Sequence, residues 1–122
     1  MIGYVTLGTN NLPRAAKFYD SLLALLGGKR MMETERNVAW NAGAGGGVGV
    51  CKPFDGKAAT VGNGVMIALA AGSRANVDAL YKKALELGGT DEGPPGPRGN
   101  QGFYAAYFRD LDGNKLSAFH VG

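Results

Sequence analysis

The clearest pattern in the chain is a stripe of apolar residues at helical spacing between residues 12 and 26. Asn11 is suited to cap the start of this helix, Pro13 fits its first turn, and Gly27-Gly28 is a typical helix end. Because the stripe is apolar on one side only, it predicts an amphipathic helix that packs against another element.

Runs with strand composition, rich in β-branched, aromatic and small residues, lie on both sides of this helix. The last two runs are separated by Asp112-Gly113-Asn114, which favours the turn of a β-hairpin. Segment 93–101 contains three prolines and is predicted to be a loop. Strands are expected over residues 2–9, 29–33, 37–42, 47–52, 63–71, 90–92, 103–108 and 116–121.

The same order of elements occurs twice. A second helical stripe runs from Val77 to Leu87, with Ser73 as its expected cap and Gly88-Gly89 as its expected end. A shift of 61 residues places Gly27-Gly28 on Gly88-Gly89, which indicates an internal duplication.

The repeat predicts one α+β domain made of two βαβββ modules. Module 1 is expected over about residues 1–53, a crossing loop over about 54–62, and module 2 over about 63–122. Each four-stranded sheet carries only one helix, so its second face must be buried against something else. We therefore expect a curved mixed sheet around a concave cleft, with the helices outside.

Composition and charge narrow the class of partner. The net charge of +3 comes from 13 basic and 10 acidic side chains that are scattered along the chain, so we expect no nucleic-acid partner. A small neutral or anionic ligand fits this charge better than a cationic one. No apolar run is long enough to cross a bilayer, and Met1–Tyr4 lacks signal-peptide features, which predicts a cytoplasmic protein without membrane contact.

The single cysteine, Cys51, has no second thiol with which to form an intramolecular disulfide or a metal knuckle. We interpret it as a small buried apolar residue, with a reactive thiol as the less favoured alternative.

Three segments together resemble a known family. They are the opening strand 4–7 with helix start 11–19 and its Phe18-Tyr19 pair, the strand 65–69, and the hairpin 108–116, which is similar to the motif F-x-D-P-D-G-N-x-[LI]-E. The chain thereby resembles the vicinal oxygen chelate superfamily, which contains glyoxalase I, bleomycin- and fosfomycin-resistance proteins and extradiol dioxygenases. The resemblance implies the two-module fold, a site in the sheet cleft, and a homodimer or a two-module monomer.

Catalytic members of this superfamily usually hold a divalent metal through His, Glu or Gln side chains. The resemblance places the four ligand positions on Tyr4, Val50, Met66 and Ser117. None of these is a good ligand, so we predict no metal and no cofactor. His120, the only histidine, lies three residues after Ser117 and should point to the opposite face of the strand. Asp110 and Asp112 are explained by backbone bonding in the hairpin turn.

The expected cleft has an apolar wall and few polar groups, which is typical of a binding pocket. Its expected lining residues are Tyr4, Thr6, Trp40, Val50, Met66, Ala68, Arg98, Tyr104 and Ser117. Arg98 is a candidate for holding a carboxylate or phosphate, with a solvated loop arginine as the alternative. For Trp40 and Tyr104, pocket wall and core packing both stay open.

Three hypotheses follow. The preferred one is a metal-independent member that binds a small molecule, with antibiotic sequestration as one use. The second is a lyase, isomerase or dioxygenase whose divalent metal is held by other ligands. The third is a structural dimer without an active cleft.

Overall fold

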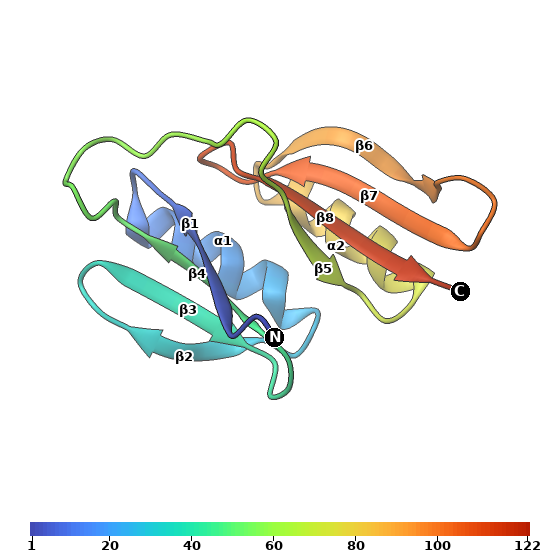
Figure 1. Ribbon diagram of the computed structural model, residues 1–122, viewed down its shortest axis with the longest axis horizontal. Coiled ribbons are helices and arrows are strands. Elements are labelled where there is room, and N and C mark those ends of the chain that lie inside the picture. Colours follow the sequence, from blue (N-terminus) through green and yellow to red (C-terminus); the bar gives the residue numbers. More distant parts are fainter. The chain divides into compact units, whose positions relative to one another are not determined.

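In a computed structural model that describes residues 1–122, the chain divides into two units, Met1–Val61 (unit 1) and Gly62–Gly122 (unit 2), shown in Figure 1. Each unit contains one four-stranded mixed sheet and one helix in the order βαβββ. The predicted α+β class and its two βαβββ modules are therefore confirmed.

Unit 1 has the strand order β1-β4-β3-β2, in which β1 is parallel to β4 and the other pairs are antiparallel. Its elements are β1 (Tyr4–Gly8), α1 (Leu12–Ala24), β2 (Lys29–Glu33), β3 (Asn37–Asn41) and β4 (Gly47–Cys51).

Unit 2 repeats this topology with the order β5-β8-β7-β6, and β5 is parallel to β8. Its elements are β5 (Ile67–Ala70), α2 (Arg74–Glu86), β6 (Thr90–Pro97), β7 (Phe103–Arg109) and β8 (Lys115–Val121).

Both helices begin at the predicted caps. The Asn11 side chain accepts a hydrogen bond from the Arg14 amide at 3.1 Å, and the Ser73 hydroxyl accepts one from the Asn76 amide at the same distance. Each helix is followed by a glycine with positive φ, Gly27 in unit 1 and Gly88 in unit 2, a conformation that costs other residues more. Neither helix is long and apolar enough to cross a membrane.

Two predicted strands have different bounds in the structure. The proline-rich segment is a strand, because β6 extends to Pro97 instead of ending at residue 92. As an edge strand, β6 tolerates prolines that cannot donate to a ladder, and its register shifts between Asp91 and Gly93 and again before Gly96. β5 begins only at Ile67, after a turn in which Gly64 has φ +93°.

The hairpin turn between β7 and β8 is organised by Asp110. One carboxylate oxygen of Asp110 accepts hydrogen bonds from the amides of Asp112 and Asn114, and the other accepts from the Asn114 side chain at 2.9 Å. Asp110 therefore bonds its own turn, as the sequence predicts.

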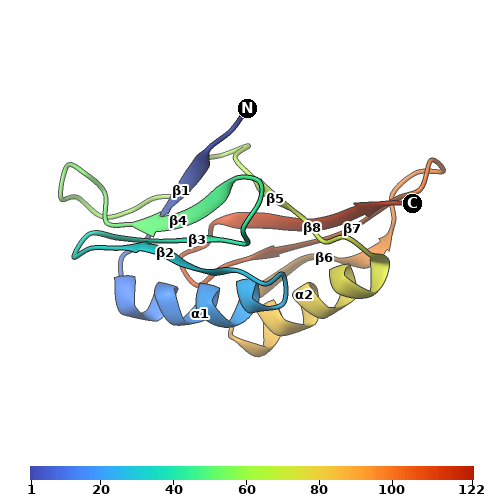
Figure 2. The same ribbon diagram turned by 90° about the horizontal axis from the view of Figure 1, so that it is seen from below.

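Each helix covers one face of the sheet in its own unit (Figure 2). In unit 1, Leu22 of α1 and Trp40 and Val50 of the sheet are almost fully buried; in unit 2, Leu80 and Phe108 are. These apolar side chains form one core between helix and sheet in each unit.

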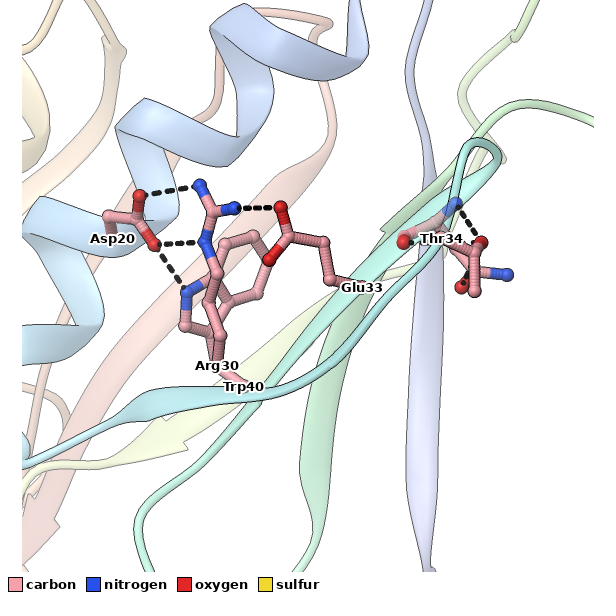
Figure 3. Close-up of polar contacts among 6 residues, drawn as sticks. Asp20, Arg30, Glu33, Thr34 and Trp40 are labelled. Atoms are coloured by element: carbon pink, nitrogen blue, oxygen red, sulfur yellow. Dashed lines mark hydrogen bonds and ion pairs between the residues drawn. The ribbon is translucent and has the colours of Figure 1, made fainter.

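A polar cluster ties α1 to the edge of its sheet (Figure 3). Asp20 accepts from the Arg30 guanidinium at 2.9 and 2.8 Å and from the indole N–H of Trp40 at 2.8 Å. Arg30 also bonds Glu33 at 2.9 Å. The Arg30 guanidinium holds the pKa of Asp20 below its ordinary value, and the Trp40 indole acts in the same direction, against the opposing effect of burial.

Candidate functional site

The face of each sheet that carries no helix, called here the open face, is the candidate site. Strand register decides which residues lie on it, because paired residues share a face and successive residues alternate. In unit 1, Thr6 pairs with Gly49, which pairs with Ala39. Tyr4 pairs with Gly47 on the same face. Tyr4, Thr6, Ala39, Gly47 and Gly49 therefore lie together on the open face of unit 1.

The centre of this face has almost no side chains. A Cβ atom at Gly47 would lie 3.1 Å from the sulfur of Met31 and 3.5 Å from the Cβ of Tyr4. A Cβ atom at Gly49 would lie 3.3 Å from the Cβ of Ala39 and 3.6 Å from a methyl carbon of Thr6. We call Gly47, Gly49 and Ala39 the glycine strip. It is bordered by Tyr4, which is 64% exposed, and by Met31, which is 58% exposed.

The open face of unit 2 carries larger side chains than that of unit 1, and it includes the charged residue Lys115. Ala68 pairs with Ser117, and Ser117 pairs with Tyr107. Phe103 and Phe119 stack on the same face with ring centroids 5.7 Å apart. Ser117 is only 1% exposed, so it contributes to the floor of this face and is not accessible.

Three predicted pocket residues lie on the helix-covered faces instead. Val50 pairs with Leu7 and is fully buried against unit 1's core, one residue out of phase with the open face. Trp40 is buried and bonds Asp20 of α1. The hydroxyl of Tyr104 donates to Asp78 of α2 at 2.6 Å. Core packing is thus the alternative that the structure supports for Trp40, whereas Tyr104 is half-buried on the helix side of unit 2.

Arg98 lies just after β6 on the open side of unit 2. Its guanidinium carbon is 5.3 Å from the ring centroid of Tyr107, and Nη2 donates to the carbonyl oxygens of Pro94 and Ala105. Met66 immediately precedes β5 and is 41% exposed. His120 pairs with Tyr104, so it lies on the helix-covered face, opposite to Ser117, as strand alternation predicts.

The donor atoms present do not fit the divalent metal that catalytic relatives hold. No group of three or more His, Cys, Asp or Glu side chains is placed to bind an ion. At the end of β4 the open-face residues are Gly49 and Cys51, not Val50, so the ligand position there corresponds to a glycine or a thiol. Glycine has no side-chain donor, and a lone thiol is a partial ligand set at most.

Sequence reasoning missed Tyr107 and Lys115. The Lys115 ammonium is 5.5 Å from the ring centroid of Tyr107, on the side of the sheet that Ser117 shares. Lys115 lies two residues before Ser117 in β8, and Tyr107 pairs with Ser117 across the hairpin, so both share its sheet face. This alternation of faces along the strands could have identified them from the sequence.

Two tyrosines bond carboxylates at the helix side of unit 2. Hydrogen bonding to Asp78 raises the pKa of Tyr104, with desolvation in support. Desolvation raises the pKa of Tyr81, with a hydrogen bond to Asp91 in support. Both phenols are therefore donors at neutral pH and belong to the fold and not to the open face.

The fold is therefore that of a two-module α+β protein, in which each βαβββ module leaves one sheet face without a helix. The family model for the glyoxalase/bleomycin resistance protein/dioxygenase superfamily matches residues 1–117, and the chain belongs to that superfamily. No curated protein matches the chain.

Solved structures agree with this assignment. A glyoxalase/bleomycin resistance protein from Albidiferax ferrireducens T118 is 39% identical, covers 98% of each chain and superposes with a TM-score of 0.90. The hypothetical protein SA1046 from S. aureus is 28% identical over 98% of this chain and 95% of its own, with a TM-score of 0.70. Lactoylglutathione lyase from Agrobacterium tumefaciens, at 20% identity and a TM-score of 0.70 over 98% of this chain and 92% of its own, shares the fold.

Proposed function

We propose that this protein binds a small neutral or anionic molecule on its open sheet faces without the divalent metal of its catalytic relatives. One observation carries the proposal: the open-face positions that correspond to metal ligands hold side chains that bind metals poorly or have no donor. They are Tyr4, Gly49 and Ser117 on the open faces and Met66 immediately before β5; Cys51, the other open-face residue at the end of β4, adds one thiol at most. What remains is apolar surface with a few hydroxyl and cationic groups, which is the composition of a ligand-binding surface.

The side chains around the glycine strip support binding in unit 1. Gly47, Gly49 and Ala39 are buried, and the exposed Tyr4 and Met31 beside them offer a ligand an aromatic ring and a polarisable thioether. Tyr4 contributes a hydroxyl that donates or accepts a hydrogen bond. These side chains provide an apolar contact surface and one hydrogen-bonding hydroxyl, but no general base for catalysis.

The test combines elemental analysis with ligand screening. We expect purified protein to contain far less than one divalent metal per chain, and a thermal-shift screen of small acids and neutral aromatics to give hits that persist in a chelator. Tyr4→Ala, which removes the exposed ring beside the strip, should abolish hits that depend on unit 1, whereas Gly96→Ala, in open space in unit 2, is the control. One tightly held metal per chain would refute metal independence.

A metal-dependent enzyme is the second candidate, and Cys51 is the observation that favours it. Cys51 is partly exposed and shares the open face of β4 with Gly49, and a thiolate is a ligand for zinc and related ions. In that case Cys51→Ser would lower the metal content, whereas the proposed binding protein keeps its ligand affinity in the same variant. Sedimentation tests the homodimer that the family resemblance implies.

A further inference from the structure

Two cations contact one aromatic ring on the open face of unit 2. The Arg98 guanidinium carbon is 5.3 Å, and the Lys115 ammonium 5.5 Å, from the ring centroid of Tyr107. We call these three residues the Arg98–Tyr107–Lys115 cluster. The electron-rich face of a phenol ring attracts each cation, but it leaves the positive charge of both uncompensated.

Neither cation has a carboxylate partner. The ion pairs of unit 2 join Lys83 to Glu86 and Arg109 to Glu92. Both side-chain hydrogen bonds of Arg98 come from Nη2 and go to backbone carbonyls, so Nε and Nη1 keep their donor capacity. A guanidinium with free N–H groups attracts an anion, and the ammonium at the same ring adds a second positive charge.

The fold holds the guanidinium in place. The Arg98 amide donates to the Phe103 carbonyl at 2.7 Å, which pins the start of the β6–β7 connection. Gly93 leaves room for the ring and the guanidinium, since a Cβ there would lie 3.0 Å from Tyr107 and 3.5 Å from Nη2 of Arg98. A side chain fixed in advance loses less conformational entropy when a ligand binds.

Apolar surface adjoins the charge. Arg98 bonds the carbonyl of Ala105, Ala105 pairs with Phe119, and Phe119 stacks on Phe103. The stacked rings of Phe103 and Phe119 therefore lie on the same face as Tyr107, at the neighbouring pair of residues along the strands. A ligand that satisfies both features has an aromatic or apolar body and one anionic group.

We infer that the Arg98–Tyr107–Lys115 cluster binds the carboxylate or phosphate of an aromatic or apolar acid, with Arg98 as the main donor and Lys115 as the second positive charge. The assignment rests on the proposed function and specifies the ligand class of unit 2's open face. Nε and Nη1 of Arg98 donate to the anion, and the stacked rings of Phe103 and Phe119 contact the body of the ligand.

The test is a calorimetric titration of the full chain with four probes: benzoate, phenyl phosphate, inorganic phosphate and neutral benzyl alcohol. We expect the two aromatic anions to bind more tightly than either benzyl alcohol or inorganic phosphate. Arg98→Gln should weaken the aromatic anions about tenfold, and Lys115→Gln a few-fold. Exposed Lys82 on α2 provides the charge-matched control, and Lys82→Gln should leave their affinity unchanged.

Arg98→Lys serves as the second variant, because it keeps the charge and removes the planar fork; it should give an intermediate loss. The unfolding midpoint of each variant checks that the fold is intact. Equal effects of Arg98→Gln and Lys82→Gln, with Lys115→Gln silent, would overturn the assignment. If benzyl alcohol binds as well as benzoate, the anion site is wrong but small-molecule binding stands. If no probe binds, the site is wrong, and the separate ligand screen decides the proposed function.

Discussion

Replacing Asp20 by alanine should destabilise unit 1 more than an ordinary surface ion pair would. Asp20 accepts the hydrogen bond from the indole N–H of Trp40, a side chain that is 1% exposed, and it also binds the Arg30 guanidinium at 2.8 Å. Alanine removes both contacts and leaves the indole N–H of this buried side chain without its acceptor.

The two contacts differ in their contributions. The side chains of Asp20 and Arg30 are 41% and 33% exposed, so solvent screens the ion pair, which contributes about 0.5 kcal/mol. An unsatisfied buried donor costs about 1–3 kcal/mol. We therefore expect Asp20→Ala to lower the free energy of unfolding by about 2 kcal/mol. Asp20→Asn retains an acceptor for the indole and should cost less than about 1 kcal/mol.

Urea unfolding followed by tryptophan fluorescence measures this directly, since Trp40 is the only tryptophan and reports on unit 1. With a urea slope of about 2 kcal/mol per M, Asp20→Ala should lower the midpoint by about 1 M. Glu33→Ala, which removes a partner of Arg30 alone, is the control and should shift it little. If Asp20→Ala shifts the midpoint no more than Glu33→Ala, the indole bond contributes nothing. If Asp20→Asn matches Asp20→Ala, the charge and not the acceptor is responsible.

Three further predictions concern pH and backbone space. Arg30 lowers the pKa of Asp20 in the folded protein. The stability that ionised Asp20 contributes is therefore present above the unfolded pKa and is lost as pH falls through the folded pKa. The difference in urea midpoint between wild type and Asp20→Asn should shrink below about pH 4. Asp78 raises the pKa of Tyr104, so the stability that the protonated Tyr104 hydroxyl contributes is lost as pH rises through the folded pKa. The melting temperature of Tyr104→Phe should therefore fall less than that of wild type above about pH 10. Gly89→Ala should destabilise unit 2 by about 2 kcal/mol or more, because the new Cβ would lie 2.7 Å from the Arg109 carbonyl oxygen and 2.8 Å from that of Ala84, whereas Gly96→Ala should change the melting temperature little; equal midpoints would contradict the steric argument.

Local signals made the elements predictable from the sequence. The caps Asn11 and Ser73, the glycine helix ends and the Asp110 turn each depend on a few neighbouring residues, and each is present in the structure. The edge strand β6 was not predictable from composition, because its prolines are tolerated only at a sheet edge, and edge position is a property of the folded sheet.

The open-face residues were predictable only in part, because a strand's face depends on register. A displacement of one residue in β4 exchanges Gly49 for Val50 and moves the position from the open face to the core. Within the hairpin the turn fixes the register, so Ser117 was assigned to the correct strand face relative to His120. The position of Arg98 against Tyr107 required the folded course of β6.

The two units show where the duplicated fold has kept its contacts and where it has changed them. Asp20 and Tyr81 lie 61 residues apart on equivalent helices, and their partners Arg30 and Asp91 are also 61 residues apart. The helix-to-strand hydrogen bond is thus present in both units with donor and acceptor exchanged, since Asp20 accepts in unit 1 and the Tyr81 hydroxyl donates in unit 2. Such an exchange keeps the geometry because each pair stays complementary.

The open faces have no such correspondence. Unit 1 has the glycine strip, which is buried beside the exposed side chains of Tyr4 and Met31, whereas unit 2 has a ring flanked by two cations. Packing against a helix demands complementary partners in both units, but an uncovered face is free to change without loss of the core. The difference in chemistry therefore falls where a ligand would contact the protein. We accordingly expect Tyr4→Ala and Arg98→Gln to alter ligand binding while the helix-side pairs govern stability.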